Sequence, residues 1–368
     1  MNETQLRAWL ALYFTPHIGA KRFAKLLAKG TPEQHQQASD LALQTLGFSS
    51  KQIQAFKSES SRNIDEALHW QQKPHRHIIS CQCAEYPPLL AQLSDAPPLL
   101  FVEGDKTLLA HPQIAIVGSR HASPEGLSHA FAFARELVAC DLAVTSGLAL
   151  GIDGYVHDGA LQAGGKTVAV LGSGLANCYP KRHQGLAQRI AEQGALVSEF
   201  APKTPPRPEH FPRRNRVISG LALAVLVIEA AKNSGSLITA RLAAEQGRDV
   251  FALPQSLSMT QAQGGNHLIQ QGAGLVMSVQ DIIEGVQPLL NWTLVQQEQH
   301  FSSANEEQQL PFPELFANVG NEATPVDILA SRMQMPVQEV MMQLLELELL
   351  GQVVAVSGGY IRKGRGER

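Results

Sequence analysis

Three arginines stand where a helix is expected to begin, and at that position they require an anion. The stretch EHFPRRNR places Arg213, Arg214 and Arg216 directly behind Pro212, and proline is typical of the first turn of a helix. The N-terminal end of a helix carries a partial positive charge, so cations there are unfavourable in the free protein. A bound phosphate would neutralise the arginines and interact favourably with the helix end. The spacing therefore indicates an anion-binding site.

The segment that leads into these arginines is basic and rich in proline. The sequence APKTPPRPEHFPRRNR holds one acid and five cations, at positions 203, 207, 213, 214 and 216. Phe211 lies among them, and Arg207 lies in the proline-rich part. Cations that follow phosphates, with a ring that stacks on a base, are typical of single-strand binding. In the alternative interpretation Phe211 fills the core, and the arginines pair with Glu199 and Glu229.

A second set of anion-binding groups follows the apolar run QIAIV. The loop VGSRHASPEG places Gly118, Ser119 and Arg120 directly after that run. Ser123 and Pro124 then favour a helix start, whose free backbone N–H groups would bind an anion. Arg120 adds a bidentate donor fork; the alternative is a surface arginine paired with a carboxylate. The loop is not G-x-G-x-x-G, and no Walker A sequence occurs in the chain, so dinucleotide or ATP binding has weak support.

Three further glycine-rich loops offer donors or cations after apolar runs. LGSGLANCYPKRHQ brings Lys181 to the end of one run. SGSLITARL begins a helix with the hydroxyls of Ser234 and Ser236, and QGGNHLIQQG places Asn266 after two glycines. Each loop adds hydrogen-bond donors of the kind that bind phosphate.

One loop has the residue types of a catalytic pair but the wrong spacing. In TSGLALGIDGYVHDGAL, Asp153 stands at a helix entry, and His157 and Asp158 follow within the helix. Adjacent helical residues do not face each other, so these two cannot form a relay; close glycine packing is the favoured reading. None of the loops offers a nucleophile with a base, paired carboxylates or metal-ligand spacing. The loops therefore offer anion-binding groups without a recognisable catalytic site.

Short apolar runs alternate with helical periodicity from about residue 112. The runs are QIAIV at 113, LAVTS at 142, TVAVL at 167, ALVSEF at 195, LAVLVIEA at 223, DVFALP at 249 and GLVMS at 274. This alternation predicts an α/β domain with a doubly wound, mostly parallel, Rossmann-like sheet. In such a fold ligands bind at the carboxyl ends of the strands, where all the loops above would lie.

The flanking segments differ in pattern from this central domain. Residues 1–75 have helical periodicity with TPHIGAKRF between two helices, which predicts a helix-hairpin-helix or SAM-like domain. The central domain is predicted over 76–287. Residues 288–322 are rich in Gln, Asn, Glu and Ser and are expected to be a linker without regular structure. Residues 323–368 suggest two helices and a hairpin, as in a winged helix.

The composition indicates a reduced cytoplasmic protein without a metal or cofactor. The chain has 368 residues, a formal net charge of −3 and four cysteines, so no disulfide framework is expected and any anion site must be local. Cys81 and Cys83 lie near His75 and His77, but no second ligand pair follows at a zinc spacing. The sequence shows no signal peptide and no apolar run long enough to span a membrane.

Together the motifs resemble those of the DNA-processing protein A family of bacteria (DprA, also called Smf). The matching stretches are IAIVGSR at 114, TSGLALGID at 145, VLGSGLANCYP at 170, SEF at 198, FPRRNRVISGL at 211, SGSLITARLAAEQGRDVFALP at 234 and GGNHLIQQGA at 264. They cover about residues 110 to 280 in order and spacing. Two positions depart from the family pattern: Gln255 stands where a glycine often follows Pro254, and Gln263 stands where a cation often precedes the glycines.

The resemblance implies a non-enzymatic role in natural transformation. It implies a homodimer that binds and protects incoming single-stranded DNA and loads RecA onto it. The implied DNA contacts are Arg120, Lys181, Arg207 and the Arg213–Arg216 cluster, with Phe211 stacking on a base. With the loops above, the candidate DNA-binding residues are Gly118, Ser119, Arg120, Lys181, Arg207, Phe211, Arg213, Arg214, Asn215, Arg216, Ser234, Ser236 and Asn266.

Two other functions remain open from the sequence. The glycine-rich loops also resemble those of nucleotide or phosphoribosyl hydrolases of the lysine-decarboxylase-like group, although the P-G-G-x-G-T-x-x-E loop of that group is absent. The tail could act like a transcription factor, but its helix QEVMMQLLELELL is acidic and apolar, which is unfavourable for a phosphate backbone. We expect that helix to contact protein rather than duplex DNA.

Overall fold

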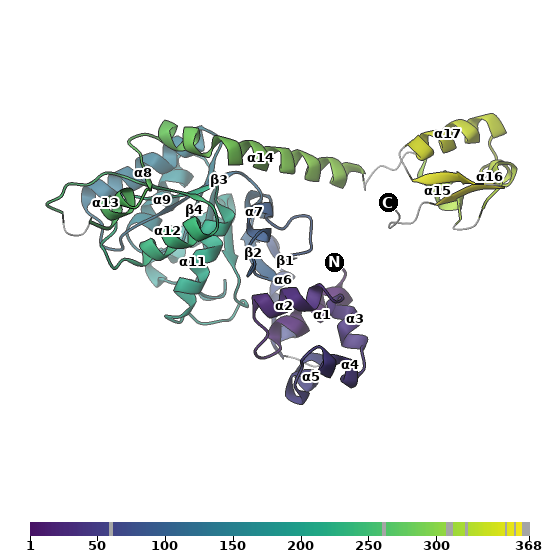
Figure 1. The fold of residues 1–368 in the computed structure, drawn as a ribbon, viewed down its shortest axis with the longest axis horizontal. Coiled ribbons are helices and arrows are strands. Elements are labelled where there is room, and N and C mark those ends of the chain that lie inside the picture. The colour runs from purple at the N-terminus through teal and green to yellow at the C-terminus, as the bar shows by residue number, and fades with distance from the viewer. Residues whose placement is uncertain are drawn as a thin grey trace. The chain divides into compact units, whose positions relative to one another are not determined.

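The computed structural model describes residues 1–58, 62–259, 263–306, 312–320, 323–349, 352–356 and 358–362. It divides into two compact units, Met1–Gln297 and Glu298–Arg368. The first unit holds the N-terminal helices and the central sheet, and the second holds the predicted winged helix (Figure 1).

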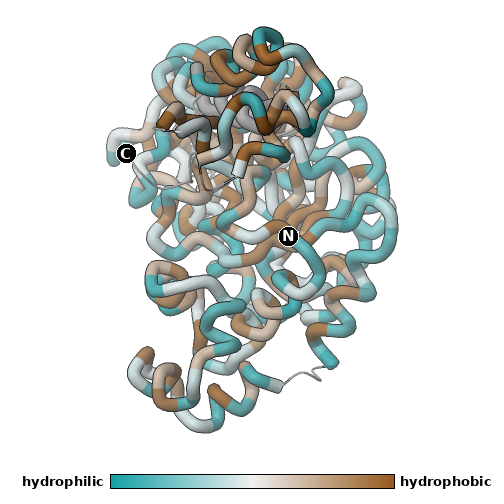
Figure 2. The backbone as a smooth tube through the Cα atoms, turned by 90° about the vertical axis from the view of Figure 1, so that its right-hand side faces the viewer, coloured by the Kyte–Doolittle hydropathy of each residue, from teal (hydrophilic) through white to brown (hydrophobic). Residues whose placement is uncertain are grey.

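The N-terminal part is helical, as expected. Its helices are α1 (Glu3–Phe14), α2 (Ala20–Leu27), α3 (Pro32–Gln37), α4 (Asp40–Thr45), α5 (Ser50–Lys57) and α6 (Arg62–Gln71). Asn2, Thr31 and Ser49 each form a capping box with a glutamine three residues later, which satisfies N–H groups at the helix start. Hydrophilic and hydrophobic residues alternate along the coiled parts of the tube in Figure 2, as expected for helices with one buried face.

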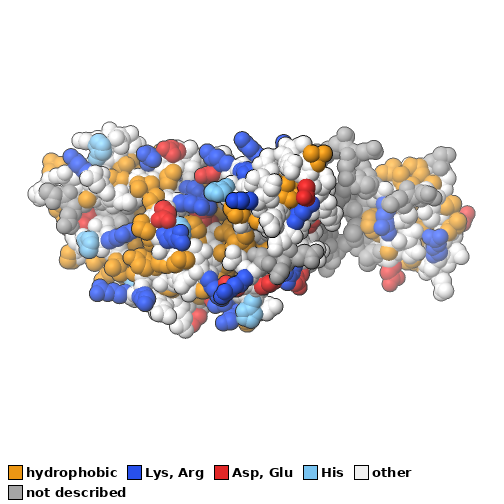
Figure 3. Space-filling model, turned by 90° about the horizontal axis from the view of Figure 1, so that it is seen from below, with side chains coloured by type: hydrophobic (Ala, Val, Ile, Leu, Met, Phe, Trp, Pro, Cys, Tyr) orange, Lys and Arg blue, Asp and Glu red, His pale blue; other side chains and the backbone are white. Residues whose placement is uncertain are grey.

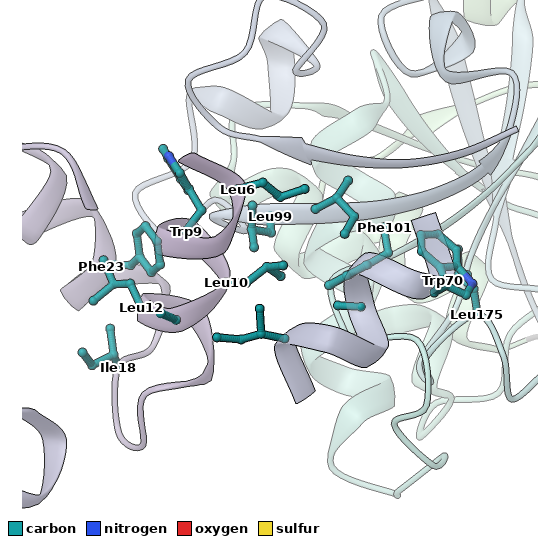
Figure 4. Close-up of a cluster of buried hydrophobic side chains, with 14 of the residues drawn as sticks. Leu6, Trp9, Leu10, Leu12, Ile18, Phe23, Trp70, Leu99, Phe101 and Leu175 are labelled. Carbon is teal, nitrogen blue, oxygen red and sulfur yellow. The ribbon is translucent and has the colours of Figure 1, made fainter. Parts of the chain in front are cut away.

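The N-terminal helices share a hydrophobic core with the sheet. Leu10 of α1 and Trp70 of α6 pack in one buried cluster with Leu99 and Phe101 (Figure 4). The ring centres of Trp70 and Phe101 lie 5.9 Å apart in an edge-on arrangement. This shared core places α6 directly beside the sheet.

The sheet has nine strands among the described residues, in the order β1-β2-β6-β5-β4-β3-β7-β8-β9. The strands are β1 (Arg76–Ser80), β2 (Leu99–Gly104), β3 (Gln113–Val117), β4 (Ala143–Ser146), β5 (Thr167–Val170), β6 (Ala195–Ser198), β7 (Ala224–Val227), β8 (Asp249–Ala252) and β9 (Gly274–Leu275). All seven predicted runs are strands, and β3 to β9 pair in parallel. The sequence analysis did not predict β1 and β2, which add to the edge at β6 in antiparallel fashion.

Helices cover both faces of the sheet. They are α7 (Pro88–Ala91), η1 (Lys106–Leu109), α8 (Pro124–Ala139), α9 (Ile152–Gln162), η2 (Lys181–His183), α10 (Gln184–Gln193), α11 (His210–Leu221), α12 (Gly235–Glu245), α13 (Gln263–Gln270) and α14 (Val279–Glu306). Along β3, Ile114 and Ile116 pack with α8 and α9. Ala115 and Val117 pack with α11 and α12 on the other face, toward the viewer in Figure 1. This two-sided cover confirms the doubly wound, Rossmann-like prediction.

Two local predictions differ from the structure. Helix α11 begins at His210, two residues before Pro212, which the first turn tolerates because its N–H groups have no partner within the helix. Helix α14 continues to Glu306, so the expectation of an unstructured linker is wrong over 288–306. Glutamine and glutamate are good helix formers, and their polarity was mistaken for a lack of structure. The domain limits themselves stay predictions.

The second unit has the winged-helix architecture that the sequence predicts. Its elements are α15 (Pro313–Asn318), α16 (Val326–Met333), α17 (Val337–Leu349), β10 (Val353–Val356) and β11 (Gly359–Arg362). The two strands pair in antiparallel fashion. Leu329, Val340, Leu344 and Val353 join helices and hairpin in one small core.

Candidate nucleic-acid interface

The loops that the sequence singles out meet at the carboxyl ends of the parallel strands. Gly118 follows β3, Gly147 follows β4 and Gly172 follows β5. The start of α11 lies against the last two loops: a Cβ on Gly147 would be 2.6 Å from Arg214, and one on Gly172 would be 2.8 Å from Phe211. Side chains at these two positions would displace Arg214 and Phe211, so the glycines let α11 approach the sheet edge.

Phe211 is the centre of this assembly. The Arg120 Cζ atom lies 5.9 Å and the Arg214 Cζ atom 6.0 Å from its ring centre, within reach of a cation–π interaction. The ring of Tyr179 lies 5.6 Å away. Phe211 is half-buried and lies outside the hydrophobic cores of the described residues. The alternative that it fills the core is therefore not supported.

Arg214 is a buried support for the ring rather than an exposed contact. It is 5% exposed, and its guanidinium donates to the carbonyl oxygens of Gly147 and Val170. The Asp153 carboxylate accepts from the backbone N–H groups of Gly147 and Ala149. Burial lowers the pKa of Arg214 to about 10, and the nearby charge of Asp153 opposes that shift. Burial likewise raises the pKa of Asp153, and the charge of Arg214 opposes that shift, so each group favours the charged form of the other.

The other two arginines are paired with one carboxylate. Arg213 and Arg216 each approach the same oxygen of the buried Glu199 at 2.7 Å. Glu229 instead accepts from the backbone N–H and hydroxyl of Ser123. The sequence analysis expected a bound phosphate to neutralise this cluster, but Glu199 already pairs with both arginines and Asp95 also lies 3.6 Å from Arg216. Only Arg213 keeps half of its side chain exposed.

Asn215, Ser234 and Ser236 connect α11 to α12. Asn215 accepts from Arg214 through Oδ1 and donates to the carbonyl oxygen of Gly235 through Nδ2. The hydroxyls of Ser234 and Ser236 lie 2.6 Å apart, and Ser234 accepts from the backbone N–H of Ser236 as the N-cap of α12. Asn215 thus joins Arg214 to the start of α12, and the polar atoms of the three residues are largely occupied.

Asn266 is engaged elsewhere. Its Oδ1 accepts from the backbone N–H of Gln255 at 3.0 Å, and its Nδ2 donates to the carbonyl oxygen of Gln255 at 2.9 Å. The pair fixes the loop after β8, at one of the two positions that depart from the family pattern. The structure therefore does not bring Asn266 to Phe211.

Gly118 and Ser119 shape the first loop, and Arg120 projects from it. The carbonyl oxygen of Ser119 accepts from the N–H of Ile152 at 3.1 Å. Gly151 has a φ of +78°, and a Cβ there would lie 2.2 Å from that carbonyl oxygen. This close approach lets a hydrogen bond between backbone groups hold Ser119 in place, and the Arg120 side chain is left exposed.

Three of the predicted cations are exposed and have no carboxylate partner in the described part of the chain: Arg120, Lys181 and Arg207. Lys181 begins η2, two residues after Tyr179 and its contact with Phe211. The carbonyl oxygen of Arg207 accepts from the N–H of His210, one turn before Phe211. Lysine and arginine side chains lie among apolar ones on the underside of the molecule in Figure 3. Arg120 therefore lies exposed beside the ring, and Lys181 and Arg207 lie exposed a few residues from Tyr179 and Phe211 in the sequence.

Sequence reasoning gave no role at this site to two residues that the structure places in it. Tyr179 lies against Phe211, and Asp153 holds the loop beneath Arg214. The position of Tyr179, directly before Pro180 and the predicted cation Lys181, could have indicated that it belongs to the site. The helix-entry position of Asp153 gave no indication of its partner, because Arg214 is distant in sequence.

The His157–Asp158 pair does not form a relay, as expected. His157 is fully buried, and its Nδ1 donates to the Thr167 hydroxyl, which itself donates to the carbonyl oxygen of Val144. Asp158 pairs with Arg189 at 2.8 Å on the surface. Burial lowers the pKa of His157 to about 3, and His183 and Arg214 add to that shift. His157 is therefore a neutral structural residue.

Acidification is expected to destabilise the fold through His157. Below the ordinary histidine pKa of 6.5, the unfolded chain binds a proton that the folded chain does not. The free energy of unfolding should then fall by about 1.4 kcal/mol for each pH unit between 6.5 and the folded pKa. Urea unfolding of the wild type and His157→Gln over this range measures the effect. Equal pH dependence in both proteins would contradict it.

No group of three or more metal-ligating side chains could hold a metal ion within the described ranges. Over the same residues, no helix is both long and apolar enough to span a membrane.

Comparison with known protein families covers all three parts of the chain. A family model described as DNA recombination-mediator protein A matches residues 77–287. The DprA winged helix domain matches residues 301–359, and the SMF/DprA SAM domain matches residues 1–69.

Individual relatives agree with these matches. The Smf protein of Escherichia coli (strain K12) is 48% identical over 327 residues, which span 88% of this chain and 87% of the relative. The DNA processing protein DprA of Streptococcus pneumoniae is 46% identical over 198 residues, which span 54% of this chain and 70% of the relative.

Two solved structures share the fold. The X-ray structure of Streptococcus pneumoniae DprA superposes with a TM-score of 0.68 at 36% identity, over 77% of this chain and 98% of that chain. The DNA processing protein A of Helicobacter pylori, described with its single-stranded DNA binding mode, gives a TM-score of 0.52 at 30% identity, over 59% of this chain and 99% of that chain. The family resemblance seen in the motifs is thus confirmed, and the chain belongs to the DprA/Smf family of DNA recombination mediators.

Proposed function

We propose that this chain binds single-stranded DNA at the carboxyl edge of its sheet. The observation that carries the proposal is the position of Phe211, half-exposed between Arg120 and Tyr179, with Lys181 and Arg207 exposed close by in the chain. A base stacks on an aromatic ring, and the phosphates on either side follow the cations. The binding of single strands by the related Helicobacter pylori protein supports this proposal.

The proposed cellular role follows the family. The chain protects single-stranded DNA taken up in natural transformation, loads RecA onto it, and acts as a homodimer in the cytoplasm. A hydrolase has no support among the described residues of this edge, because His157 is buried and Asp158 is paired with Arg189. We infer that the winged helix contacts protein, since α17 exposes Met341, Met342 and Leu345 beside its acids.

Salt dependence tests the binding site. Three exposed cations that each meet a phosphate give a slope of log K against log salt of about −2, from about −0.7 per contact on single strands. Arg120→Ala and Lys181→Ala should each weaken the binding of oligo-dT and reduce the magnitude of the slope by about 0.7. Fluorescence anisotropy with oligo-dT and a matched duplex over a salt series measures both.

Arg241→Ala is the matched control, because Arg241 is an exposed arginine of α12 that pairs with Glu245. It should leave affinity and slope unchanged. A slope near zero, a preference for duplex, or wild-type binding in both pocket variants would reject the site. The rate at which RecA assembles on oligo-dT covered by single-strand-binding protein tests the loading role, and this chain should raise it.

A further inference from the structure

A basic groove lies between α6 and two loops that lead to Phe211. Its volume is about 600 Å³, which is large enough for a nucleotide-sized ligand. Four cations and two acids line it, together with Trp70 and the chain at Ala176 and Pro202: Arg62, Lys73, Arg76, Lys203, Asp65 and Glu66. Arg76 is paired with Glu103 at 3.0 Å, so the excess positive charge of the groove comes from Lys73 and from Arg62 and Lys203, which share Glu66.

Two backbone segments connect the groove to the Phe211 site. The N–H of Ala176 donates to the carbonyl oxygen of Pro202 at 2.9 Å, and the Asn177 amide donates to that of Lys203 at 2.8 Å. From this junction one chain segment reaches Tyr179, whose ring contacts Phe211. The other segment reaches Arg207 and the start of α11. Both walls of the groove on the sheet side thus continue into the proposed DNA site.

The cations of the groove are accessible to an anion. Glu66 accepts from Arg62 Nε at 2.9 Å and from Lys203 Nζ at 3.0 Å, and both cations stay largely exposed, at 88% and 66% of their side chains. These two cations hold the pKa of Glu66 below its usual range. Exposed ion pairs contribute little to stability, so a phosphate can share or replace Glu66 as their partner. Lys73 is exposed and has no ion pair with another described residue.

The wall of the groove also holds a donor without an acceptor. Trp70 is 6% exposed, and its indole Nε1 has no hydrogen-bond partner among the described residues. Buried donors are nearly always satisfied, and each exception needs an explanation. Figure 4 draws the indole nitrogen on the side of Leu175, which directly precedes Ala176 in the groove lining. An acceptor oxygen from a ligand in the groove would satisfy it.

We propose that this groove is a second subsite for the same single strand, so that the helical N-terminal part binds DNA together with the central domain. The proposal rests on the proposed function, because the strand reaches the groove from Phe211. Arg62 and Lys203 contact phosphate oxygens, and Trp70 donates to the strand. A strand too short to extend beyond Phe211 does not use the subsite.

Oligonucleotide length separates the two sites. We compare oligo-dT of about 5 and about 15 nucleotides, which bracket common single-strand site sizes. The double variant Arg62→Gln/Lys203→Gln should bind the longer strand several-fold more weakly, with the slope reduced in magnitude by about 1.4. Its binding of the shorter strand should equal that of the wild type. Lys57→Gln, which removes an exposed pair with Asp40 in the same helical part, should change neither.

Tryptophan fluorescence gives an independent test of the second subsite in the wild-type protein, whose groove cations are unchanged. The longer strand should change the emission of the wild type, and Trp70→Phe, which keeps a ring in the core, should abolish most of that change. Wild-type affinity of the double variant for the longer strand, equal losses on both strands, or an emission change that Trp70→Phe retains would each overturn the second subsite. Wild-type binding of both strands by Lys181→Ala would instead reject the Phe211 site.

Discussion

Phe211→Ala is expected to weaken the binding of oligo-dT by about 1–3 kcal/mol, which is the usual value of one base stacked on an aromatic ring. This corresponds to a loss of affinity of roughly 5- to 150-fold. The slope of log K against log salt should stay at the wild-type value, because the ring carries no charge and the phosphate contacts remain. Anisotropy titration of oligo-dT over a salt series measures both quantities. The combination separates stacking from phosphate binding.

Two further variants test whether the position of the ring matters. Phe211→Tyr keeps an aromatic face and should retain most of the affinity. Gly172→Ala places a methyl group 2.8 Å from the Phe211 ring, so the half-exposed ring must move and affinity should fall by a few-fold. A full loss in Phe211→Tyr, or an altered salt slope in Phe211→Ala, would show that the ring acts by supporting the fold.

Most of the sheet could be predicted because its strands are buried on both faces. A strand such as β5, TVAV, reads as a continuous apolar run between glycine-rich turns, and right-handed crossovers then place the loops at one edge. Strands β1 and β2 are antiparallel and lie among short irregular segments. No alternation with helices marks them, so the pattern that identified the others could not identify these.

The loops of the site could be predicted, but the role of each cation could not. Sequence order places Arg213, Arg214 and Arg216 together, and the structure gives each a different environment. Arg214 turns into the sheet edge, whereas Arg213 and Arg216 share Glu199. These differences depend on which face of α11 packs on the sheet, and thus on partners up to 121 residues away in the sequence. From the sequence alone, the different roles of these three arginines could not be distinguished.

The glycines were informative for a related reason. A glycine at a strand end indicates close approach of another segment, and Gly147 and Gly172 each receive one side chain of α11. The sequence identifies the glycine at which another segment comes close, but it does not identify the side chain that packs there. The structure supplies that assignment for Phe211 and Arg214, as it does for the contacts of Tyr179 and Asp153.

Asp153→Asn is expected to lower the free energy of unfolding by about 1.5–3 kcal/mol, since the carboxylate accepts two backbone N–H groups and its charge favours the nearby buried Arg214 cation. Both side chains are almost fully buried, and both bind the Gly147 peptide, one at its N–H and the other at its carbonyl oxygen. Asp158→Asn is the matched control on the same helix, because Asp158 pairs with Arg189 at the surface. Asp158→Asn should lower the free energy of unfolding by less than about 1 kcal/mol. Urea unfolding at neutral pH measures each.

A double-mutant cycle shows whether the two charges act on each other. Arg214→Met removes the cation but keeps an apolar stem, and the double variant Asp153→Asn/Arg214→Met leaves neither charge buried. If the two single losses were additive, the double variant would lose their sum. We expect its free energy of unfolding to be about 1–3 kcal/mol higher than that additive value. Its oligo-dT binding should fall only modestly, since Arg214 supports the Phe211 ring from beneath while Arg120 and Lys181 remain exposed. Strictly additive losses would mean that the carbonyl oxygens of Gly147 and Val170 hold Arg214 without help from Asp153, and that the buried charge pair is not what positions the ring.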